Sequence, residues 1–235
     1  MSKPRKIGKG KQEFLFRGLI TVTIETLVTV GDLFSSNCQT LVNTVNTRGV
    51  MGKGIALEFK KRFESTNMFA DYRSRCDRSV LRVGEPYLWK PLKGLQQSLL
   101  LDELPAPASP AGLAKWVLNF PTKDHWRAQS KLPDIIRGLE SFSKNYKDWG
   151  VESIAFPALG CGNGGLEWWQ VGPIMYRHLH NLETRVEIFA PLGTPPDQLT
   201  AAFLSERQGV RNRLNPEGRR RRDMAAFTSP YDRAD

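Results

Sequence analysis

LVNTVNTRGVMGKG, residues 41–54, runs directly into IALEFKKRF and is the segment on which the predicted fold depends. It begins with apolar residues typical of a buried strand, passes two asparagines, and then has three glycines within six residues before an amphipathic helix. Glycines let backbone N–H groups turn toward an anion, and a helix N-terminus adds positive partial charge. The spacing is neither a Walker P-loop nor a dinucleotide-binding G-x-G-x-x-G. An ordinary strand–turn–helix corner would show the same pattern.

The composition is that of a globular protein with basic ends. A chain of 235 residues is long enough for one domain with a full core, and 40% hydrophobic residues is an ordinary content. Most of the net charge of +10 comes from the ends, because 1–17 carry six Lys and Arg against one Glu, and 205–235 carry eight Arg against five acids. Basic ends favour a polyanionic partner, although solvated charge would give the same composition.

The cysteines and the apolar runs indicate the compartment. Cys38, Cys76 and Cys161 are odd in number and widely spaced, which favours a reducing environment without a disulfide framework. No apolar run reaches 18 residues, and the basic N-terminus lacks the apolar core of a signal peptide. We therefore expect a cytoplasmic, monomeric protein without a membrane partner.

Strand-like and helix-like segments alternate along the chain, which predicts an α/β fold whose mixed sheet is covered on both faces. We predict strands at 14–30 (one or two), 41–46, 83–90, 97–103, 115–121, 151–159 and 185–191. We predict helices at 54–63, 68–76, 166–182 and 197–208, and one that begins at Pro133 with Gly150 as its C-cap.

The same pattern suggests three parts of the chain. These are a flexible basic arm (1–16), a single domain (17–195), and a C-terminal helix with an Arg-rich tail (196–235). A Pro- and Ala-rich loop within 103–114 is typical of an insertion. The role of the Arg run at 219–222 stays open.

A second glycine-rich turn, GCGNGG at 160–165, also follows an apolar strand and precedes a helix. In an α/β sheet both turns lie at the carboxyl edge, where ligands bind, so two turns facing one crevice could hold the two phosphates of a pyrophosphate. Asp32 follows the first strand at the same edge, and its carboxylate could accept from an amine such as that of adenine. A turn or helix cap explains Asp32 equally well.

Two further groups of polar residues follow strands. The amides of Asn43 and Asn46 suit the hydroxyls of a ribose, although asparagines also close turns by bonding their own backbone. Lys123 at a strand end could be partly desolvated, and a desolvated lysine can act as a nucleophile. His125, Trp126 and Arg127 offer stacking and charge to a base or a nucleotide backbone, but a solvated surface loop would have the same composition.

Metal and cysteine chemistry are not indicated. His178 and His180 stand two apart on a predicted helix and point to different faces, with Cys161 far away, so we expect no metal site and no cofactor. Cys161 lies between two glycines, which is more typical of a small buried packing residue than of a nucleophile.

Four segments in this order, GDLF (31–34), LVNTVNTRGVMGKGIALEFKKRF (41–63), NFPTKDHWR (119–127) and PALGCGNGGLEW (157–168), make the sequence similar to macrodomains, and most of all to those of the DarG antitoxins. The resemblance covers about residues 24–191. It implies a three-layer α/β/α fold with a cleft for ADP-ribose. It also implies hydrolytic removal of ADP-ribose from thymidine bases of single-stranded DNA, which reverses the modification made by a DarT-type transferase toxin.

The resemblance also implies roles for residues. Lys123 matches the lysine on which catalysis depends, and Asn46 would hold the distal ribose. His125, Trp126 and Arg127 would lie near the DNA base. The residues that we expect to bind ADP-ribose are Asp32, Leu33, Asn43, Gly52, Lys53, Gly54, Gly160, Cys161, Gly162, Asn163, Gly164 and Phe189. For Lys53 we expect the backbone to matter more than the ammonium.

This sequence departs from related patterns in two respects. The related terminal ADP-ribose protein glycohydrolase of animals has an aspartate where this chain has Gly164, so its two-residue mechanism is not expected here. DarG proteins usually carry a further C-terminal domain that binds the toxin, which leaves a toxin partner open. Two other functions also stay open: an ADP-ribose reader without turnover, and a hydrolase of ADP-ribosyl carboxylate esters on proteins.

Overall fold

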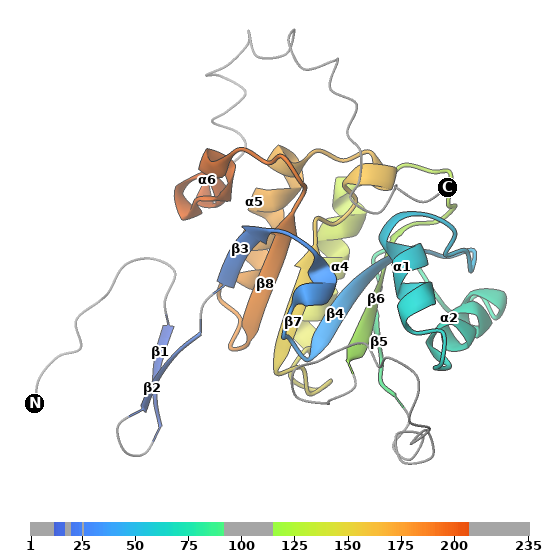
Figure 1. Cartoon of the computed structure of the whole chain (residues 1–235), viewed down its shortest axis with the longest axis horizontal. Coiled ribbons are helices and arrows are strands. Elements are labelled where there is room, and N and C mark those ends of the chain that lie inside the picture. The colour runs from blue at the N-terminus through green and yellow to red at the C-terminus, as the bar shows by residue number, and fades with distance from the viewer. Residues whose placement is uncertain (1–11, 17–19, 25, 92–114, 207–235) are drawn as a thin grey trace, which may run out of the picture.

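A six-stranded mixed sheet forms the centre of the computed structural model, which describes residues 12–16, 20–24, 26–91 and 115–206 (Figure 1). Five neighbouring strands are parallel, and the last is antiparallel to its neighbour. Their spatial order is β3 (Thr26–Val30), β8 (Arg185–Ala190), β7 (Ser153–Pro157), β4 (Thr40–Asn46), β6 (Trp116–Lys123) and β5 (Tyr87–Trp89).

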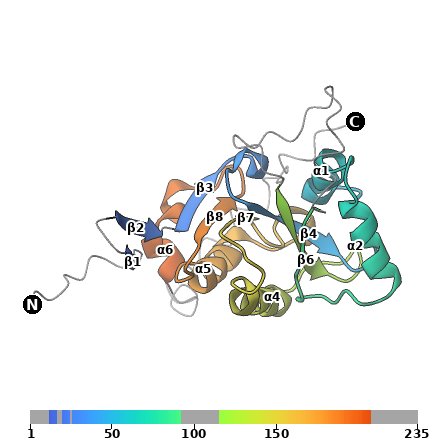
Figure 2. The same ribbon diagram turned by 90° about the horizontal axis from the view of Figure 1, so that it is seen from below.

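Helices cover both faces of this sheet (Figure 2). The helices α1 (Gly54–Arg62) and α2 (Met68–Asp77) enclose one apolar core with residues such as Phe59. On the other face, α4 (Leu132–Asn145), α5 (Trp168–Leu179) and the short α6 (Ala201–Ser205) enclose a second core. The two cores confirm the predicted α/β/α layers. None of the helices in the described ranges is long and apolar enough to cross a membrane.

The N-terminal stretch contains more strands than predicted. Residues 12–16 form the strand β1 (Gln12–Phe16), which pairs antiparallel with β2 (Ile20–Ile24) in a separate two-stranded sheet. The stretch 14–30 therefore holds parts of three strands rather than one or two. The β-branched residues of this stretch predict strands but not where the chain breaks between them. Most of the predicted arm, residues 1–11, lies outside the described residues.

Two helix ends also differ from the predictions. Gly150 is not the C-cap of α4, because the helix ends at Asn145 and Tyr146 caps it. Gly150 instead adopts φ +73° in the following turn, where Val151 N donates to Tyr146 O at 2.9 Å. The helix predicted over 197–208 is a 3-10 turn, η3 (Pro196–Leu199), and then α6, whose first turn is capped by Thr200. The predicted strand at 97–103, the insertion at 103–114 and the Arg run at 219–222 lie outside the described residues.

The connections of the sheet create a crevice at its carboxyl edge. The neighbouring strands β4 and β7 lead to helices on opposite faces, because β4 is followed by α1 and β7 by α5. In open α/β sheets the ligand binds where consecutive connections leave in opposite directions. The loops after β4 and β7, which are the two glycine-rich turns of the sequence, therefore meet at the place where a ligand is expected.

The position of Lys123, the catalytic candidate at the end of β6, depends on the packing of α4 against this strand. Gly138 of α4 lies so close to Phe120 that an added Cβ would be 2.2 Å from Phe120 Cζ. We expect Gly138→Ala to lower the free energy of unfolding by about 1–3 kcal/mol, although alanine gains about 1 kcal/mol of helix propensity. Denaturant unfolding measures this, with Glu140→Ala at an exposed position of α4 as the control. Equal stability of the two variants would contradict the close approach.

Candidate functional site

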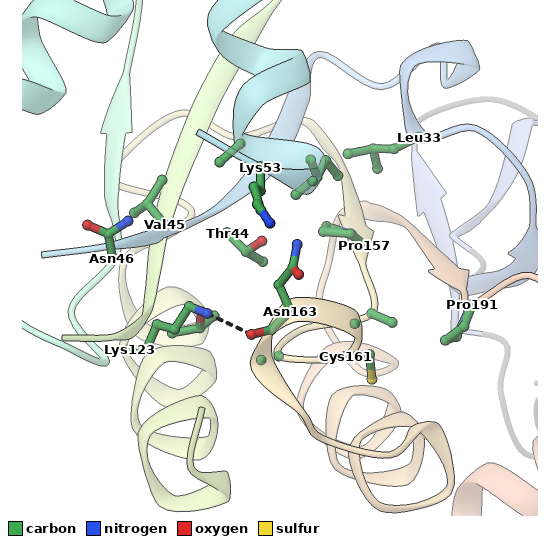
Figure 3. Close-up of a pocket in the computed structure, with 18 of the residues that line it drawn as sticks. Leu33, Thr44, Val45, Asn46, Lys53, Lys123, Pro157, Cys161, Asn163 and Pro191 are labelled. Atoms are coloured by element: carbon green, nitrogen blue, oxygen red, sulfur yellow. Dashed lines mark hydrogen bonds between the residues drawn. The ribbon is translucent and has the colours of Figure 1, made fainter. Parts of the chain in front are cut away.

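A cavity of about 580 Å³ opens at the carboxyl edge of the sheet (Figure 3). It is lined by the loops that follow β3, β4, β6, β7 and β8, which agrees with the edge predicted from the sequence. The predicted site residues that line this pocket are Leu33, Asn46, Gly52, Lys53, Gly54, Lys123, Trp126, Arg127, Gly160, Cys161, Gly162, Asn163, Gly164 and Phe189. Asp32, Asn43 and His125 are not among the lining residues.

The two glycine-rich turns face each other across the pocket. Gly54 adopts φ +57°, and a Cβ added there would be 2.8 Å from Asn163 Nδ2 in the opposite turn. This approach confirms the prediction that the two turns share one crevice. In Figure 3 the side chains of Lys53 and Asn163 point toward one another across the space. Lys53 therefore offers its ammonium to the pocket as well as its backbone.

Lys123 stands at the end of β6, half-buried, at one end of the pocket. Its Nζ donates to the backbone oxygen of Asn163 at 2.7 Å (Figure 3). The register of β4 and β6 shifts after Val45, so that Lys123 pairs with Asn46. Burial lowers the pKa of the Lys123 ammonium, because the charged form loses hydration. Lys123 is therefore partly desolvated, as its place at a strand end suggests.

Asn46 uses its side chain to shape the loop behind it. Its Nδ2 donates to Val50 O at 2.6 Å, and its Oδ1 accepts from Arg48 N at 2.9 Å. From α2, the buried Tyr72 hydroxyl donates to the Asn46 backbone oxygen at 2.9 Å. The loop-closing role that the sequence left open is therefore present, and the amide still borders the pocket. Tyr72 could not be identified from the sequence, because an anchoring tyrosine looks like any other core residue of an amphipathic helix.

The prediction for Asn43 is wrong. Its side chain is fully buried within the sheet layer, where Nδ2 donates to Asn119 Oδ1 on β6 at 3.0 Å. Successive side chains of a strand alternate between its two faces, and Asn43 lies three residues before the strand end. It therefore joins β4 to β6 instead of reaching the pocket.

Asp32 lies beside the pocket and caps a turn. Its Oδ1 accepts from Phe34 N at 3.0 Å and so caps the 3-10 turn η1 (Leu33–Ser35), and Arg62 approaches Oδ2 to 4.0 Å. Both neighbours of Asp32 in the chain, Gly31 and Leu33, line the pocket. The cap is the alternative that the sequence left open, and contact with an adenine amine stays a prediction.

The segment after Lys123 forms an aromatic and basic stack. The rings of His125 and Trp126 lie 5.2 Å apart at 29°, and the Arg127 guanidinium is 4.3 Å from the Trp126 ring centroid. Arg127 N also donates to His125 Nδ1 at 3.1 Å. Trp126 and Arg127 line the pocket, whereas His125 supports Trp126 from outside the lining.

Cys161 and Gly164 carry little reactive chemistry. Burial raises the pKa of the Cys161 thiol to about 12, so it stays protonated and is a poor nucleophile. A Cβ at position 164 would lie 2.6 Å from Ser130 Oγ and 3.2 Å from Ser130 Cβ, and Ser130 N donates to Gly164 O at 2.8 Å. An acid at this position would therefore require Ser130 to move.

The charges of the pocket have one sign. Lys53, Lys123 and Arg127 line it, and none of the described lining residues is an aspartate or glutamate. Within the described part of the chain, no three His, Cys, Asp or Glu side chains gather as metal ligands. A cationic pocket with glycine-rich turns is suited to a phosphate-containing ligand.

The comparisons with known proteins agree with this geometry. A macro domain family model matches residues 104–175. The solved macrodomain of Thermus aquaticus DarG is 34% identical, with a TM-score of 0.59 over 71% of this chain and 98% of that one. This chain belongs to the DarG macrodomain family. The four sequence motifs at 31–34, 41–63, 119–127 and 157–168 therefore predicted the family correctly.

This DarG-type macrodomain is also similar to part of longer proteins. A fusion protein from Thermosipho africanus, named DNA ADP-ribosyl transferase-DNA ADP-ribosyl glycohydrolase, is 42% identical over 193 residues, 81% of this chain and 49% of the fusion. A solved structure of Thermosipho africanus DarTG in complex with ADP-ribose is 41% identical, with a TM-score of 0.65 over 77% of this chain and 46% of that one. The chain spans about half or less of the length of the curated relatives that it matches.

Proposed function

We propose that this DarG-type macrodomain is a glycohydrolase that removes ADP-ribose from thymidine bases of single-stranded DNA, in opposition to a DarT-type transferase. The observation that carries the proposal is Lys123, a desolvated lysine at one end of a cationic pocket, where its Nζ is held by Asn163 O. Binding of ADP-ribose alone does not need such a lysine. The names of the relatives, which include DNA ADP-ribosyl glycohydrolases, support the same substrate.

ADP-ribose fits the pocket in one orientation. Its pyrophosphate would lie between the turns that contain Gly54 and Asn163, where backbone N–H groups and the Lys53 ammonium favour negative charge. The adenine would lie between Leu33, which Figure 3 shows at the opposite end of the pocket from Lys123, and Phe189, whose ring lies beside Gly31. The distal ribose would then lie beside Asn46 and Lys123, with its anomeric carbon at the amine.

The reaction breaks the bond between this anomeric carbon and the thymine nitrogen. In one route the neutral Lys123 amine attacks the carbon, the bonding pair leaves with the thymine nitrogen, and a proton passes from the new ammonium to that nitrogen. Water then displaces the lysine amine and becomes the hydroxyl of free ADP-ribose. In the other route the Lys123 ammonium stabilises the charge that develops on the departing base while water attacks. Both routes end with free ADP-ribose and unmodified thymidine, and both depend on holding the ribose in place.

The pH profile separates the two routes. Because burial lowers the pKa of Lys123 below its ordinary value of 10.5, the neutral amine becomes available at a lower pH than in water. We expect the single-turnover rate to rise with pH and to reach half its maximum below pH 10.5. A rate that falls as the pH rises would instead indicate that the ammonium form of Lys123 is the catalytic form.

The linkage is tested with two substrates, one with ADP-ribose on thymidine in a single-stranded oligonucleotide and one with ADP-ribose on a protein glutamate, and with free ADP-ribose as the ligand. Mass spectrometry measures the release of ADP-ribose, and calorimetry measures the binding of free ADP-ribose. We expect fast release from the oligonucleotide and little from the ester. Faster release from glutamate would select the carboxylate-ester hydrolase and contradict the proposal.

The second candidate function is an ADP-ribose reader without turnover. The observation that favours it is the absence of an acid at Gly164, where a side chain would require Ser130 to move. Tight calorimetric binding of ADP-ribose without release from either modified substrate would select the reader.

A further inference from the structure

Three exposed apolar side chains line the pocket. Five large hydrophobic residues are strongly exposed in the described part of the chain: Leu27, Val50, Val80, Trp126 and Leu192. Val50, Trp126 and Leu192 line the same pocket, although they come from the separate loops after β4, β6 and β8. Apolar surface gathered around one opening indicates a bound partner more strongly than single exposed residues do.

Two of these residues belong to the end of the pocket where Lys123 lies. Val50 is 37% exposed, and its backbone oxygen accepts a hydrogen bond from Asn46 Nδ2 at 2.6 Å. Trp126, which is 43% exposed, follows Lys123 by three residues. The group attached to the distal ribose would leave the pocket at this end.

The loops of Val50 and Trp126 are tied to each other. Thr47 N donates to Asp124 O at 3.0 Å, and Arg48 forms an ion pair with Asp124 Oδ2 at 2.7 Å. Asn46 in turn holds Val50 and Arg48 from the pocket side. The two apolar side chains are therefore presented by a pre-formed pair of loops, which reduces the ordering that binding would require.

The surrounding charge identifies the kind of partner. The Arg127 guanidinium lies 4.3 Å from the Trp126 ring, and none of the described pocket-lining residues is acidic. An aromatic ring beside a cation is suited to an unpaired nucleobase next to its phosphate, and stacking of this kind tolerates any sequence. A peptide that carries a modified carboxylate would need no flat apolar surface at this point.

We propose that Val50 and Trp126 form a base clamp, which holds the modified thymine and its unpaired neighbour beside Lys123 and so selects DNA over protein substrates. The inference rests on the proposed function, and it adds Val50 as a specificity residue and Arg48 and Asp124 as the residues that position the clamp. Because the bases must be unpaired to enter between the two side chains, the clamp also accounts for a single-stranded substrate.

The test measures affinity in the Lys123→Ala background, so that substrate is not consumed. The ligands are free ADP-ribose and a single-stranded oligonucleotide with one ADP-ribosylated thymidine, measured by calorimetry and fluorescence anisotropy. We expect Val50→Ser and Trp126→Ala each to weaken oligonucleotide binding about 10-fold or more and to leave ADP-ribose binding within about 2-fold. Trp126→Phe is expected to restore most of the loss. Val80→Ser, which changes an exposed valine outside the pocket, is the control and should change neither affinity.

Two results would overturn the clamp: unchanged oligonucleotide affinity in both variants, or an equal loss for both ligands, which would make these residues part of the ADP-ribose site. Failure of the proposed function looks different. If the unaltered chain binds the modified oligonucleotide more tightly than ADP-ribose and loses this preference on mutation, but never releases ADP-ribose, the clamp stands and the glycohydrolase activity does not.

Discussion

Lys123→Ala is expected to slow the release of ADP-ribose from a thymidine-modified oligonucleotide by at least about 100-fold. The variant loses the amine at the anomeric carbon and the hydrogen bond to Asn163 O. Its affinity for free ADP-ribose should stay within about 5-fold of the unaltered chain, since one neutral hydrogen bond contributes about 1 kcal/mol. Single-turnover kinetics and calorimetry give the two quantities separately.

Lys53→Ala is the matched control for this variant. Both lysines line the pocket, but Lys53 lies on the turn that faces Asn163 rather than beside Asn46. We expect Lys53→Ala to weaken ADP-ribose affinity about 10-fold, within the range of charge-assisted contacts. The single-turnover rate of ADP-ribose release from bound substrate should stay nearly unchanged. Equal single-turnover rates for Lys123→Ala and the unaltered chain would remove Lys123 from the chemistry.

Gly54→Ala is expected to weaken ADP-ribose binding by at least about 10-fold, which is about 1.4 kcal/mol. Gly54 adopts φ +57°, a conformation that costs an L-residue about 1–2 kcal/mol. Its new Cβ would also lie 2.8 Å from Asn163 Nδ2, so the Asn163 side chain must move. The strained backbone at position 54 and the added methyl group would disturb the N–H groups that we propose for the pyrophosphate.

Gly193→Ala is the control for Gly54→Ala, because it introduces the same backbone strain outside the proposed pyrophosphate site. Gly193 adopts φ +79°, but an added Cβ there would have nothing within 4 Å. Both variants should lose a similar amount of thermal stability, and only Gly54→Ala should lose ADP-ribose affinity. Equal affinities in the two variants would show that the close approach of the turns is not needed for binding.

Most of the fold could be predicted from the sequence because its signals are local. The strand–glycine–helix pattern of 41–63 and of 151–168 already places two turns at one edge of a sheet, and the structure brings them within contact distance. The expected desolvation of Lys123 also followed from its place at a strand end. These features depend on short-range spacing and on the rule that parallel strands end together.

The features that the sequence could not predict depend on contacts between distant segments. Asn43 and Asn46 look alike in sequence, but the alternation and register of β4 against β6 bury one and bring the other to the pocket. Tyr72 reaches the Asn46 loop only because α2 packs beneath it. Val50 could be identified only from the structure, because its exposure and its place in the pocket lining both depend on the folded loops.

The most direct test of the central claim is a single-turnover time course, with the chain in excess over a single-stranded oligonucleotide that carries one ADP-ribosylated thymidine. Mass spectrometry follows the oligonucleotide and the released nucleotide. We predict complete conversion to unmodified oligonucleotide and one equivalent of free ADP-ribose. Stable binding of the oligonucleotide with its ADP-ribose still attached would contradict the claim.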